Sequence, residues 1–396
     1  MSIARDLAAW AAELTPSAED VELADRSLLD TLVVTLAARG HDAEDLVADS
    51  SDAARWATLG HVLDFDDLHM ESTSHVSVVC VPTTLAMGGD SRAYLAGAGV
   101  MARLGAALGW SHYSRGWHAT CTAGAPAAAV AAAVALGLDV DGIATSMALA
   151  VPAAGGVQRA FGTSAKSLQV GFAAEAGIRA ARLASLGASA DTSAVDQWFD
   201  LIGGDRDRLT LGGPAVPGGL AIKVFPCCYA LQRPISAVRD LPAPVDPADV
   251  TRISVQTPAS TVQPLIHSRP TTGLEAKFSL EYALAAAVLD GVPGFDSFTD
   301  AAVARPEAAA LVEKVDVSIT PGGDWLLAGE CDLEIELSDG SSLATSLVLP
   351  PGAPARPPSA KDMHTKIQLA AHDLADDVVK ASWADAPDLL REHLPR

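Results

Sequence analysis

The stretch ATCTAGAPAAAVAAAVALGL, residues 119–138, contains no charged side chain. Its length of about 20 residues would allow a helix to span a bilayer. It consists mainly of Ala, Gly and Thr, however, and alanine is too weakly apolar to make a membrane span. Pro126 lies inside the stretch, and Asp139 and Asp141 follow its end. The stretch therefore predicts a helix that is buried on all sides in the core of a soluble domain.

Helical periodicity extends from this stretch in both directions. Thr15 and Pro16 are expected to supply the N-cap and the first turn of the second helix, and several later helices are expected to end at a glycine. The helix faces are rich in Ala and Gly, which lets neighbouring helices approach closely. The candidate helices are residues 2–14, 17–38, 78–87, 92–108, 120–136, 141–153 and 164–186.

The character of the chain changes after the segment GGPAVPGG, residues 212–219. Runs of alternating apolar residues predict strands, and Asp339-Gly340 between two such runs is a strong hairpin signal. A smaller α+β unit is therefore predicted. Its expected elements are strands at 252–257 and 315–320, a hairpin around Ser338-Asp339-Gly340, and helices at 276–290 and 306–313.

A second boundary is the Pro-rich segment PPGAPARPP, residues 350–358, after which helical periodicity returns at Lys361. We therefore predict a mainly α fold with a discontinuous arrangement. A large all-helical domain is built from both chain ends, and a smaller α+β lid domain is inserted into it. The predicted bounds are 1–220 plus 355–396 for the helical domain and 221–354 for the lid domain.

Composition excludes several classes of protein. Of the 396 residues 49% are hydrophobic, which is too many for an intrinsically disordered chain. The net charge of −22, without a Lys/Arg cluster, argues against nucleic acid and anionic membranes as partners. Five cysteines form no CxxC pair and predict no disulfide framework. This cysteine usage fits a reducing cytoplasm, and no signal-peptide pattern is seen at the N-terminus, so we expect a cytoplasmic protein.

Common metal and cofactor motifs are missing from the sequence. The histidines form no HxxxH or HExxH pair, and DFDDLH at residues 64–69 lacks the spaced ligands and the glycine of an EF-hand. No GxGxxG or GxxxxGK[ST] follows a strand, and no GxSxG nucleophile elbow occurs. We therefore expect no metal and no organic cofactor.

Acidic and histidine side chains crowd into twelve residues, 64–75, which lie between the predicted helices at 17–38 and 78–87. Such a loop is commonly solvated, but its acids alternate with Leu63, Phe65 and Leu68, which indicates partial burial. Buried carboxylates beside histidines are suited to proton transfer. The crowded residues are Asp64, Asp66, Asp67, His69, Glu71 and His75.

The use of lysine is also informative, because 20 Arg but 7 Lys occur and no lysine precedes Lys166. A lysine can supply an amine that loses its proton, which Arg cannot. Lys166 and Lys223 lie in apolar surroundings, and His118 directly precedes the Ala-rich helix. The alternatives are surface lysines and an ordinary core histidine. These groups suit proton abstraction next to a carboxylate.

At these motifs the sequence resembles the MmgE/PrpD family, which includes 2-methylcitrate dehydratase, cis-aconitate decarboxylase and iminodisuccinate epimerase. The resemblance implies a large helical domain, a smaller lid domain, and a homodimer without metal or organic cofactor. The similar segments occur in the family's order: LDFDDLHMESTSHVS (63–77), GWHATCTAGAPAAAVAAAVALGLD (116–139), GTSAKSLQVGFAAEAGIRAARLASLG (162–187), IKVFPCCYALQRPISA (222–237) and EAKFSLEYALAAAVLDG (275–291).

The resemblance also implies a pocket between the two domains that binds or deprotonates a di- or tricarboxylate. His118 and Lys166 would move protons near the reacting carbon, and Lys223 would pair with a carboxylate. Which group is the base is left open. The implied catalytic residues are His118, Lys166, Asp64 and Tyr282, and the implied substrate-binding positions are His75, Lys223, Cys228 and Leu68.

The sequence departs from the family pattern at several of these positions. Leu68 stands where a Thr is common, and Cys228 stands where the decarboxylase-like members have a His. Leu231-Gln232 replaces a frequent Thr-His, and Val76 replaces the proline after His75. Because each change puts an apolar or weaker group in place of a polar one, we expect a smaller or more apolar acid than a tricarboxylate.

The leading hypothesis is a cofactor-independent lyase of the dehydratase or decarboxylase type, which abstracts a proton next to a carboxylate of a small organic acid. One alternative is a divergent isomerase, epimerase or cyclase of specialised metabolism that uses the same pocket. Another alternative is a non-catalytic carboxylate-binding scaffold.

Overall fold

In the computed structural model, which describes residues 2–321 and 323–394, the charge-free stretch forms helix α7 (Ala119–Ala135). Every residue from Ala119 to Ala133 is buried, as its composition predicts. The neighbours of α7 are α5 (Ser77–Ala86), α6 (Ser91–Ser114), α8 (Val140–Ala150) and α9 (Ala165–Ser185).

Glycines let these helices approach α7 closely. A Cβ atom at Gly97 of α6 would lie 2.7 Å from the Cβ of Ala131, and one at Gly177 of α9 would lie 2.4 Å from the Cβ of Ala128. Both distances are shorter than any side-chain contact allows. The small residues of the sequence are therefore a requirement of helix packing.

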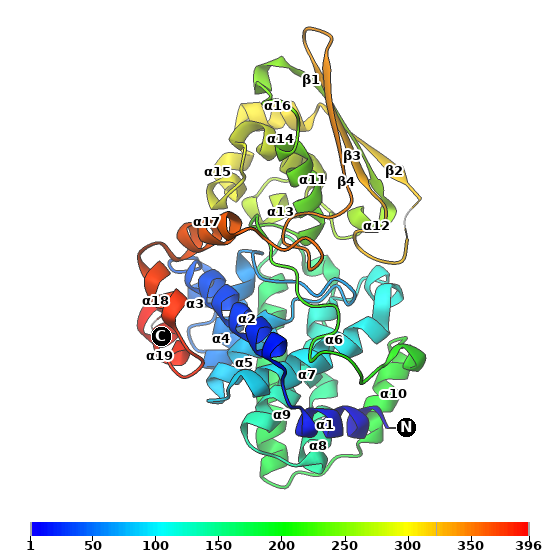
Figure 1. The fold of residues 1–396 in the computed structure, drawn as a ribbon, viewed down its shortest axis with the longest axis vertical. Helices are drawn as coiled ribbons and strands as arrows, with labels where there is room; N and C mark the ends of the chain where they lie inside the picture. The colour runs from blue at the N-terminus through cyan, green and yellow to red at the C-terminus, as the bar shows by residue number, and fades with distance from the viewer. Residues whose placement is uncertain (1, 322, 395–396) are drawn as a thin grey trace. The chain divides into compact units, whose positions relative to one another are not determined.

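The chain divides into two compact units, each of which is described by itself (Figure 1). The helical unit comprises the residues up to Arg159, Ser164–Ala221, and the residues from His364 onward. The mixed unit comprises Ala160–Thr163 and Ile222–Met363. Residues 160–163 lie inside the predicted bounds of the helical domain, 1–220, but belong with the mixed unit. Helix α17 (Ala360–Ala371) begins in the mixed unit and continues in the helical unit.

The remaining helices of the helical unit surround this core, and α18 and α19 pack against α2. They are α1 (Ile3–Glu13), α2 (Ala18–Leu36), α3 (Ala43–Leu46), α4 (Asp52–Val62), α10 (Ser193–Leu201), α18 (Ala375–Lys380) and α19 (Ala386–His393). Short 3-10 turns lie at Val151–Ala153, Gln158–Ala160, Arg206–Arg208, Pro247–Asp249, Phe295–Phe298 and His372–Leu374.

The mixed unit contains a four-stranded sheet with strand order β2-β1-β3-β4. β1 pairs in parallel with β2 and antiparallel with β3, and β3 and β4 form the hairpin predicted around Asp339-Gly340. Helices α11 and α14 pack against each other; α11 contacts β3 and β4, and α14 contacts β2. The strands are β1 (Val250–Pro258), β2 (Val315–Thr320), β3 (Cys331–Leu337) and β4 (Ser342–Leu347), and the helices are α11 (Tyr229–Arg239), α12 (Ala259–Val262), α13 (Gly273–Ala276), α14 (Leu280–Asp290), α15 (Asp300–Val303) and α16 (Pro306–Val312).

Some local predictions were wrong. The N-cap of α2 is Ser17 and not Thr15, because the Ser17 hydroxyl accepts the Asp20 backbone N–H in a capping box. At Gly109, in contrast, where a helix was predicted to end, the backbone of α6 is non-helical with a φ of 62° and a ψ of −168°, and a second helical segment follows this kink up to Ser114. The single helix predicted at 276–290 is two, α13 and α14, since Ser279 caps the second.

Two expectations about the chain as a whole concern cysteines and membranes. All five cysteines are buried and none forms a disulfide. Over the described residues, no helix combines the length and the hydropathy that crossing a bilayer requires.

Candidate active site

The loop between α4 and α5 carries the crowded acids and histidines of the sequence. Asp64 follows the end of α4 and has a φ of 54°, in the left-handed region that favours glycine. Such a conformation costs a non-glycine residue about 1–3 kcal/mol and persists where surrounding contacts hold it. Asp64, Asp66 and His75 are buried, with exposed fractions of 2%, 1% and 7%. The loop is therefore a fixed part of the core and not a solvated segment.

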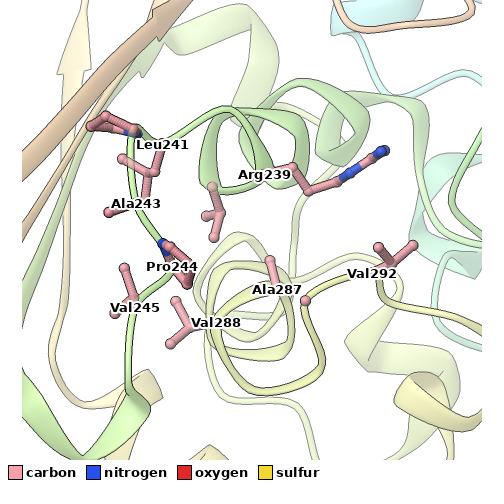
Figure 2. Close-up of a pocket in the computed structure, with 11 residues that line it drawn as sticks. Arg239, Leu241, Ala243, Pro244, Val245, Ala287, Val288 and Val292 are labelled. Carbon is pink, nitrogen blue, oxygen red and sulfur yellow. The ribbon is translucent and has the colours of Figure 1, made fainter.

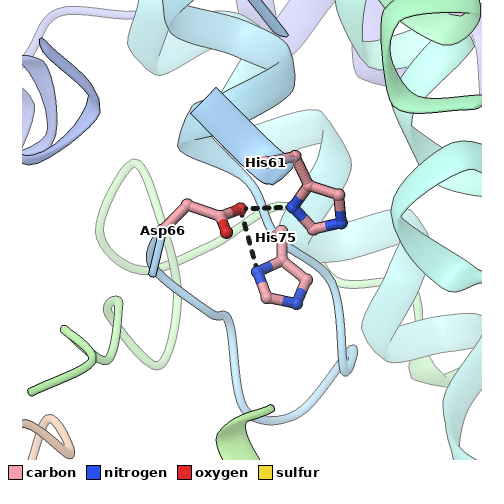
Figure 3. Close-up of side chains that lie close together, drawn as sticks. All are labelled: His61, Asp66 and His75. Carbon is pink, nitrogen blue, oxygen red and sulfur yellow. Dashed lines mark hydrogen bonds and ion pairs between the residues drawn. The ribbon is translucent and has the colours of Figure 1, made fainter. Parts of the chain in front are cut away.

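Asp66 lies between two histidines (Figure 3). The Nδ1 of His61, the next-to-last residue of α4, is 2.8 Å from Asp66 Oδ2, and the Nδ1 of His75 is 3.0 Å from the same oxygen. Burial alone would raise the pKa of the Asp66 carboxyl, but the two histidines hold that pKa well below its ordinary value. Asp66 is therefore a carboxylate that accepts hydrogen bonds and donates none.

This contact fixes the protonation of His61. Burial lowers the pKa of His61 to about 4, so its ring carries a single proton near neutral pH. Because Asp66 can only accept, that proton lies on Nδ1. The opposite nitrogen, Nε2, is left as an acceptor and lies 2.7 Å from the Nζ of Lys166. His61 thus joins the Asp66 carboxylate to the Lys166 amine.

Lys166 lies in the first turn of α9 and is 6% exposed. Besides His61, its Nζ faces the Asp64 carboxylate at 3.4 Å. The amine therefore lies between the acceptor nitrogen of a neutral imidazole and a carboxylate. Three groups that can carry a proton thus meet at one buried point.

His118 is the N-cap residue of α7 and is 1% exposed. The backbone N–H of Val157 donates to Gln169 Oε1, which fixes the orientation of the Gln169 amide. The amide nitrogen of Gln169 therefore donates to His118 Nδ1 over 2.7 Å. Burial and the nearby Lys166 charge hold the pKa of His118 well below its ordinary value. The ring is neutral, and its one proton lies on Nε2.

Lys166 and His118, both predicted as site residues, are part of one cluster. We call it the His–Lys cluster, and its members are His61, Asp64, Asp66, His75, His118 and Lys166. The rings of His61 and His118 are stacked with centroids 5.8 Å apart, and the rings of His61 and His75 are 4.6 Å apart. Every member is at least nine-tenths buried. Charges in such a place interact far more strongly than they do in water.

The ligand atoms of His61, Asp66 and His75 lie within 4.8 Å of one another and could hold a metal ion. The Lys166 amine beside His61 disfavours a second cation at this point by charge repulsion. The tautomer derived for His61 also gives both of its ring nitrogens a hydrogen-bond partner, Asp66 and Lys166. We therefore interpret the three residues as part of a proton network, and the predicted lack of a metal stays a prediction.

The other predicted site residues are distributed over both units. Leu68, in the helical unit, is 2% exposed, and its backbone pairs with Ala221. Lys223 and Cys228 lie in the mixed unit before α11, and both are buried. The hydroxyl of Tyr282 on α14 donates to the backbone oxygen of Ser297 over 2.6 Å. The approach of Lys223, Cys228 and Tyr282 to the His–Lys cluster stays a prediction.

Gln232 has a structural part in the mixed unit. Its Oε1 accepts the backbone N–H groups of Val224 and Phe225, and its Nε2 donates to the Phe225 carbonyl. The side chain thereby braces the loop that carries Lys223 and Cys228. The departure from the family pattern at this position thus serves the loop's conformation.

A cavity of about 420 Å³ in the mixed unit lies between the end of α11 and the end of α14 (Figure 2). Arg239 is the charged residue in its lining, and the rest is apolar or glycine, including Val245 and Val288. None of the predicted site residues lines it. It contains no pair of groups that could exchange protons, so it is not the candidate active site.

Sequence reasoning missed His61 and Gln169 and gave Asp66 no role of its own. His61 lies three residues before Asp64, within HVLDFDD, but the helix that carries it was not predicted. Gln169 lies three residues after Lys166, on the next turn of α9. Spacing of i and i+3 on a predicted helix was the available signal for Gln169.

Acid is expected to destabilise the protein, because the helical unit buries histidines in their neutral form. Burial lowers the pKa of His61 and of His112 to about 4, that of His118 well below the ordinary value, and that of His69 in the same direction. Unfolding near pH 5–6 therefore takes up about three to four protons, since free histidine titrates near pH 6.5. Asp67 acts in the opposite direction: burial and the Asp30 charge raise its pKa to about 7, so unfolding releases about one proton.

The net uptake is about two to three protons, so the free energy of unfolding should fall as the pH drops from about 6.5 to about 5. Urea unfolding at a series of pH values measures this slope. His112→Gln is the control, because it removes one neutral histidine outside the His–Lys cluster and should reduce the slope by about one proton. A free energy of unfolding that stays level or rises toward pH 5 would contradict the neutral assignments.

Comparison with known proteins identifies the family. Two family models match the chain: the MmgE/PrpD N-terminal domain over residues 47–198 and the MmgE/PrpD C-terminal domain over residues 225–386. The chain belongs to the MmgE/PrpD family. The N-terminal match contains the whole His–Lys cluster, and the C-terminal match contains Cys228 and Tyr282, whereas Lys223 lies just before it.

Curated MmgE/PrpD relatives are similar to this chain at a distance. A cis-aconitate decarboxylase of Aspergillus terreus is 27% identical over 363 residues, which cover 79% of this chain and 73% of the relative. The cis-aconitate decarboxylase of Homo sapiens is 26% identical over 267 residues, which cover 62% of this chain and 53% of the relative. The family prediction is confirmed, and the MmgE/PrpD chain is an enzyme of the lyase or isomerase type, not a non-catalytic scaffold.

Proposed function

We propose that this MmgE/PrpD enzyme is a lyase that works without a metal or organic cofactor and eliminates CO₂ or water from a small carboxylic acid. The observation that carries the proposal is the position of the Lys166 amine, 2.7 Å from the acceptor nitrogen of His61. A buried amine with a neutral imidazole behind it can carry one proton to or from a substrate carbon.

In decarboxylation, the bond between the carboxylate carbon and its neighbour breaks and CO₂ leaves. The electron pair stays on the substrate, where it is delocalised toward an adjacent carbonyl or carboxylate. The Lys166 ammonium then donates a proton to the carbon, and the amine regains a proton from solvent through the network. In dehydration the same amine removes the carbon-bound proton, the C–H electron pair forms the double bond, and the C–O bond on the neighbouring carbon breaks. The removed proton is shared between Lys166 and His61 Nε2 beside the Asp66 carboxylate, and it passes to the leaving hydroxide, which departs as water.

His118 has a different part. Its neutral ring presents an Nε2–H group, and a neutral imidazole is too weak an acid to give up that proton. The ring can instead donate a hydrogen bond to the oxygen on which negative charge develops, as a preorganised donor in a site of low dielectric. Its lowered pKa supports this role, because the donor stays neutral throughout the working pH range.

The remaining predicted residues complete the proposal. The Asp64 carboxylate lies 3.4 Å from the Lys166 amine and holds it in place. His75 contacts Asp66 through Nδ1, and its other ring nitrogen, Nε2, lies on the side of the ring away from Asp66. We assign Lys223 to pairing with a substrate carboxylate, and we propose that Tyr282 and Cys228, which belong to the same mixed unit as Lys223, also contribute to the site. Leu68 would provide an apolar wall.

The test is turnover in D₂O, with cis-aconitate as the first substrate because relatives carry that name. A panel of other di- and tricarboxylates follows. We expect one acid to lose CO₂ or water, read by mass spectrometry, with one solvent deuteron on the carbon of a decarboxylated product. A chelator should leave the rate unchanged, and Lys166→Met should lower it at least about 100-fold. Product formation that depends on an added metal would contradict the proposal.

A second candidate is an isomerase or cyclase that acts on a larger, more apolar acid. The burial of Leu68 and Cys228, at positions where the family pattern has polar groups, favours it. The same D₂O experiment separates the two candidates. An isomerase exchanges a carbon-bound proton of its substrate for deuterium without loss of CO₂ or water, whereas a lyase changes the substrate's composition.

Two further expectations about the protein stay predictions. The homodimer implied by the resemblance is tested by sedimentation equilibrium of the purified chain. The cytoplasmic location expected from cysteine usage is tested by fractionation of cells that express the protein.

A further inference from the structure

Lys366 is a buried cation outside the His–Lys cluster. It lies on α17, within the part of the helix that belongs to the helical unit, and its side chain is 1% exposed. Its Nζ lies 2.6 Å from Asp30 Oδ1 on α2, whose side chain is equally buried. The same Nζ donates to the backbone oxygen of Phe65 over 2.7 Å and lies 4.2 Å from the centroid of the Phe65 ring.

Phe65 lies in the chain between Asp64 and Asp66, the two residues that supply the carboxylates of the cluster. Asp64 precedes Phe65 and faces Lys166, and Asp66 follows Phe65 and contacts His61. Because the peptide group is planar, a donor that fixes the Phe65 oxygen also fixes the backbone nitrogen of Asp66. Asp64 lies in the left-handed region, a conformation that needs external contacts to persist. Lys366 supplies such a contact at Phe65, the middle residue of the segment 64–66.

Stability alone does not explain a buried ion pair of this kind. Replacement of such a pair by apolar residues of similar size is often neutral or stabilising, because desolvation of the two charges offsets their attraction. The Lys366 amine donates a hydrogen bond to the backbone carbonyl of Phe65, which an apolar side chain cannot do.

We propose that Lys366 is a positioning residue, which holds the Phe65 carbonyl and thereby sets the directions of the Asp64 and Asp66 carboxylates. Lys366 itself touches no reacting group. The inference rests on the proposed function, because the direction of these carboxylates affects a rate only if the cluster is catalytic. A displacement of about 1 Å in such a group reduces a rate up to about 100-fold.

The experiment compares three variants with the wild-type enzyme. Lys366→Met removes the donor and keeps the length of the side chain. Lys366→Met combined with Asp30→Asn also removes the buried countercharge, which keeps the variant folded if the single variant fails. Lys361→Met is the matched control, because Lys361 is an exposed lysine on the same helix.

Two readouts are taken for each variant. The first is the ring ¹⁵N spectrum of the histidines, which reports the protonated nitrogen of His61 and needs no turnover. The second is kcat and KM for the substrate found in the D₂O panel. We expect the double variant to fold, to show changed ¹⁵N signals for His61 and His75, and to lose about 10- to 100-fold in kcat with a much smaller change in KM. Lys361→Met should match the wild type in both.

The outcomes separate the inference from the proposed function. If the double variant regains both the wild-type histidine signals and the wild-type kcat, Lys366 is only a countercharge and the inference is overturned. If no substrate turns over in any form of the enzyme, the proposed function fails. The ¹⁵N spectra still decide whether Lys366 fixes the conformation of the segment 64–66. Changed signals in the double variant with an unchanged kcat would also overturn the inference.

Discussion

Lys166→Met is expected to lower kcat at least about 100-fold while the protein keeps its fold. General acid–base groups typically contribute about 10²–10⁴-fold in rate, and Lys166 is the amine that faces both His61 and Asp64. Methionine keeps the length and the apolar stem of the side chain but carries no proton. The measurement is kcat with the substrate identified in D₂O, together with circular dichroism and thermal unfolding to verify the fold.

Lys166→Arg is the matched comparison for this prediction. Arginine keeps a positive charge beside Asp64 but does not lose its proton, so it tests proton transfer apart from charge. We expect Lys166→Arg to be nearly as slow as Lys166→Met. Full activity in the arginine variant would mean that Lys166 acts only as a fixed cation, and full activity in both would exclude it from the mechanism.

His118→Phe is expected to lower kcat about 10²- to 10³-fold, the usual cost of removing one preorganised donor to a developing anion. Phenylalanine keeps a flat ring beside His61 but has no N–H group. KM should change much less than kcat, because the hydrogen bond strengthens as negative charge develops. An equal loss in both parameters, or a full rate, would show that His118 does not stabilise the transition state.

Gln169→Glu provides a companion variant that keeps His118 itself. A carboxylate in place of the Gln169 amide would accept from His118 Nδ1 and would raise the pKa of the ring. At low pH the imidazolium still has an Nε2–H donor, whereas at high pH the remaining proton moves to Nδ1. We therefore expect the rate of this variant to fall as the pH rises through the new His118 pKa. A pH profile identical to the wild type would contradict the assigned tautomer.

Much of the fold was predictable because its determinants are local. The Ala-rich stretch and the alternating runs of β1, β2 and the β3–β4 hairpin show their periods directly in the sequence. Helix α4 was missed, since Gly60 inside DAARWATLGHV suggests an end. In the structure this glycine serves packing, because a Cβ at Gly60 would lie 2.8 Å from Thr35 Oγ1.

The candidate site was predictable only in part. Asp64, His75, His118 and Lys166 were found through motifs and the scarcity of lysine, and the structure brings them into one cluster. The groups that set their protonation are supplied by tertiary contacts between distant segments. The amide orientation of Gln169, for example, depends on the Val157 backbone, and no spacing in the sequence reveals that contact.

The pairing of Asp30 with Lys366 also has a consequence for biosynthesis. The two residues are 336 positions apart, so at about 5–20 residues per second a ribosome needs roughly 20–70 s to deliver the lysine after the aspartate. During that interval the N-terminal helices emerge with a carboxylate that has no ammonium to meet it, and the whole mixed unit is translated in between. The helices that surround the Ala-rich α7 are all translated by residue 185, so this core can form early, whereas α18 and α19 can pack against α2 only after the mixed unit has been translated.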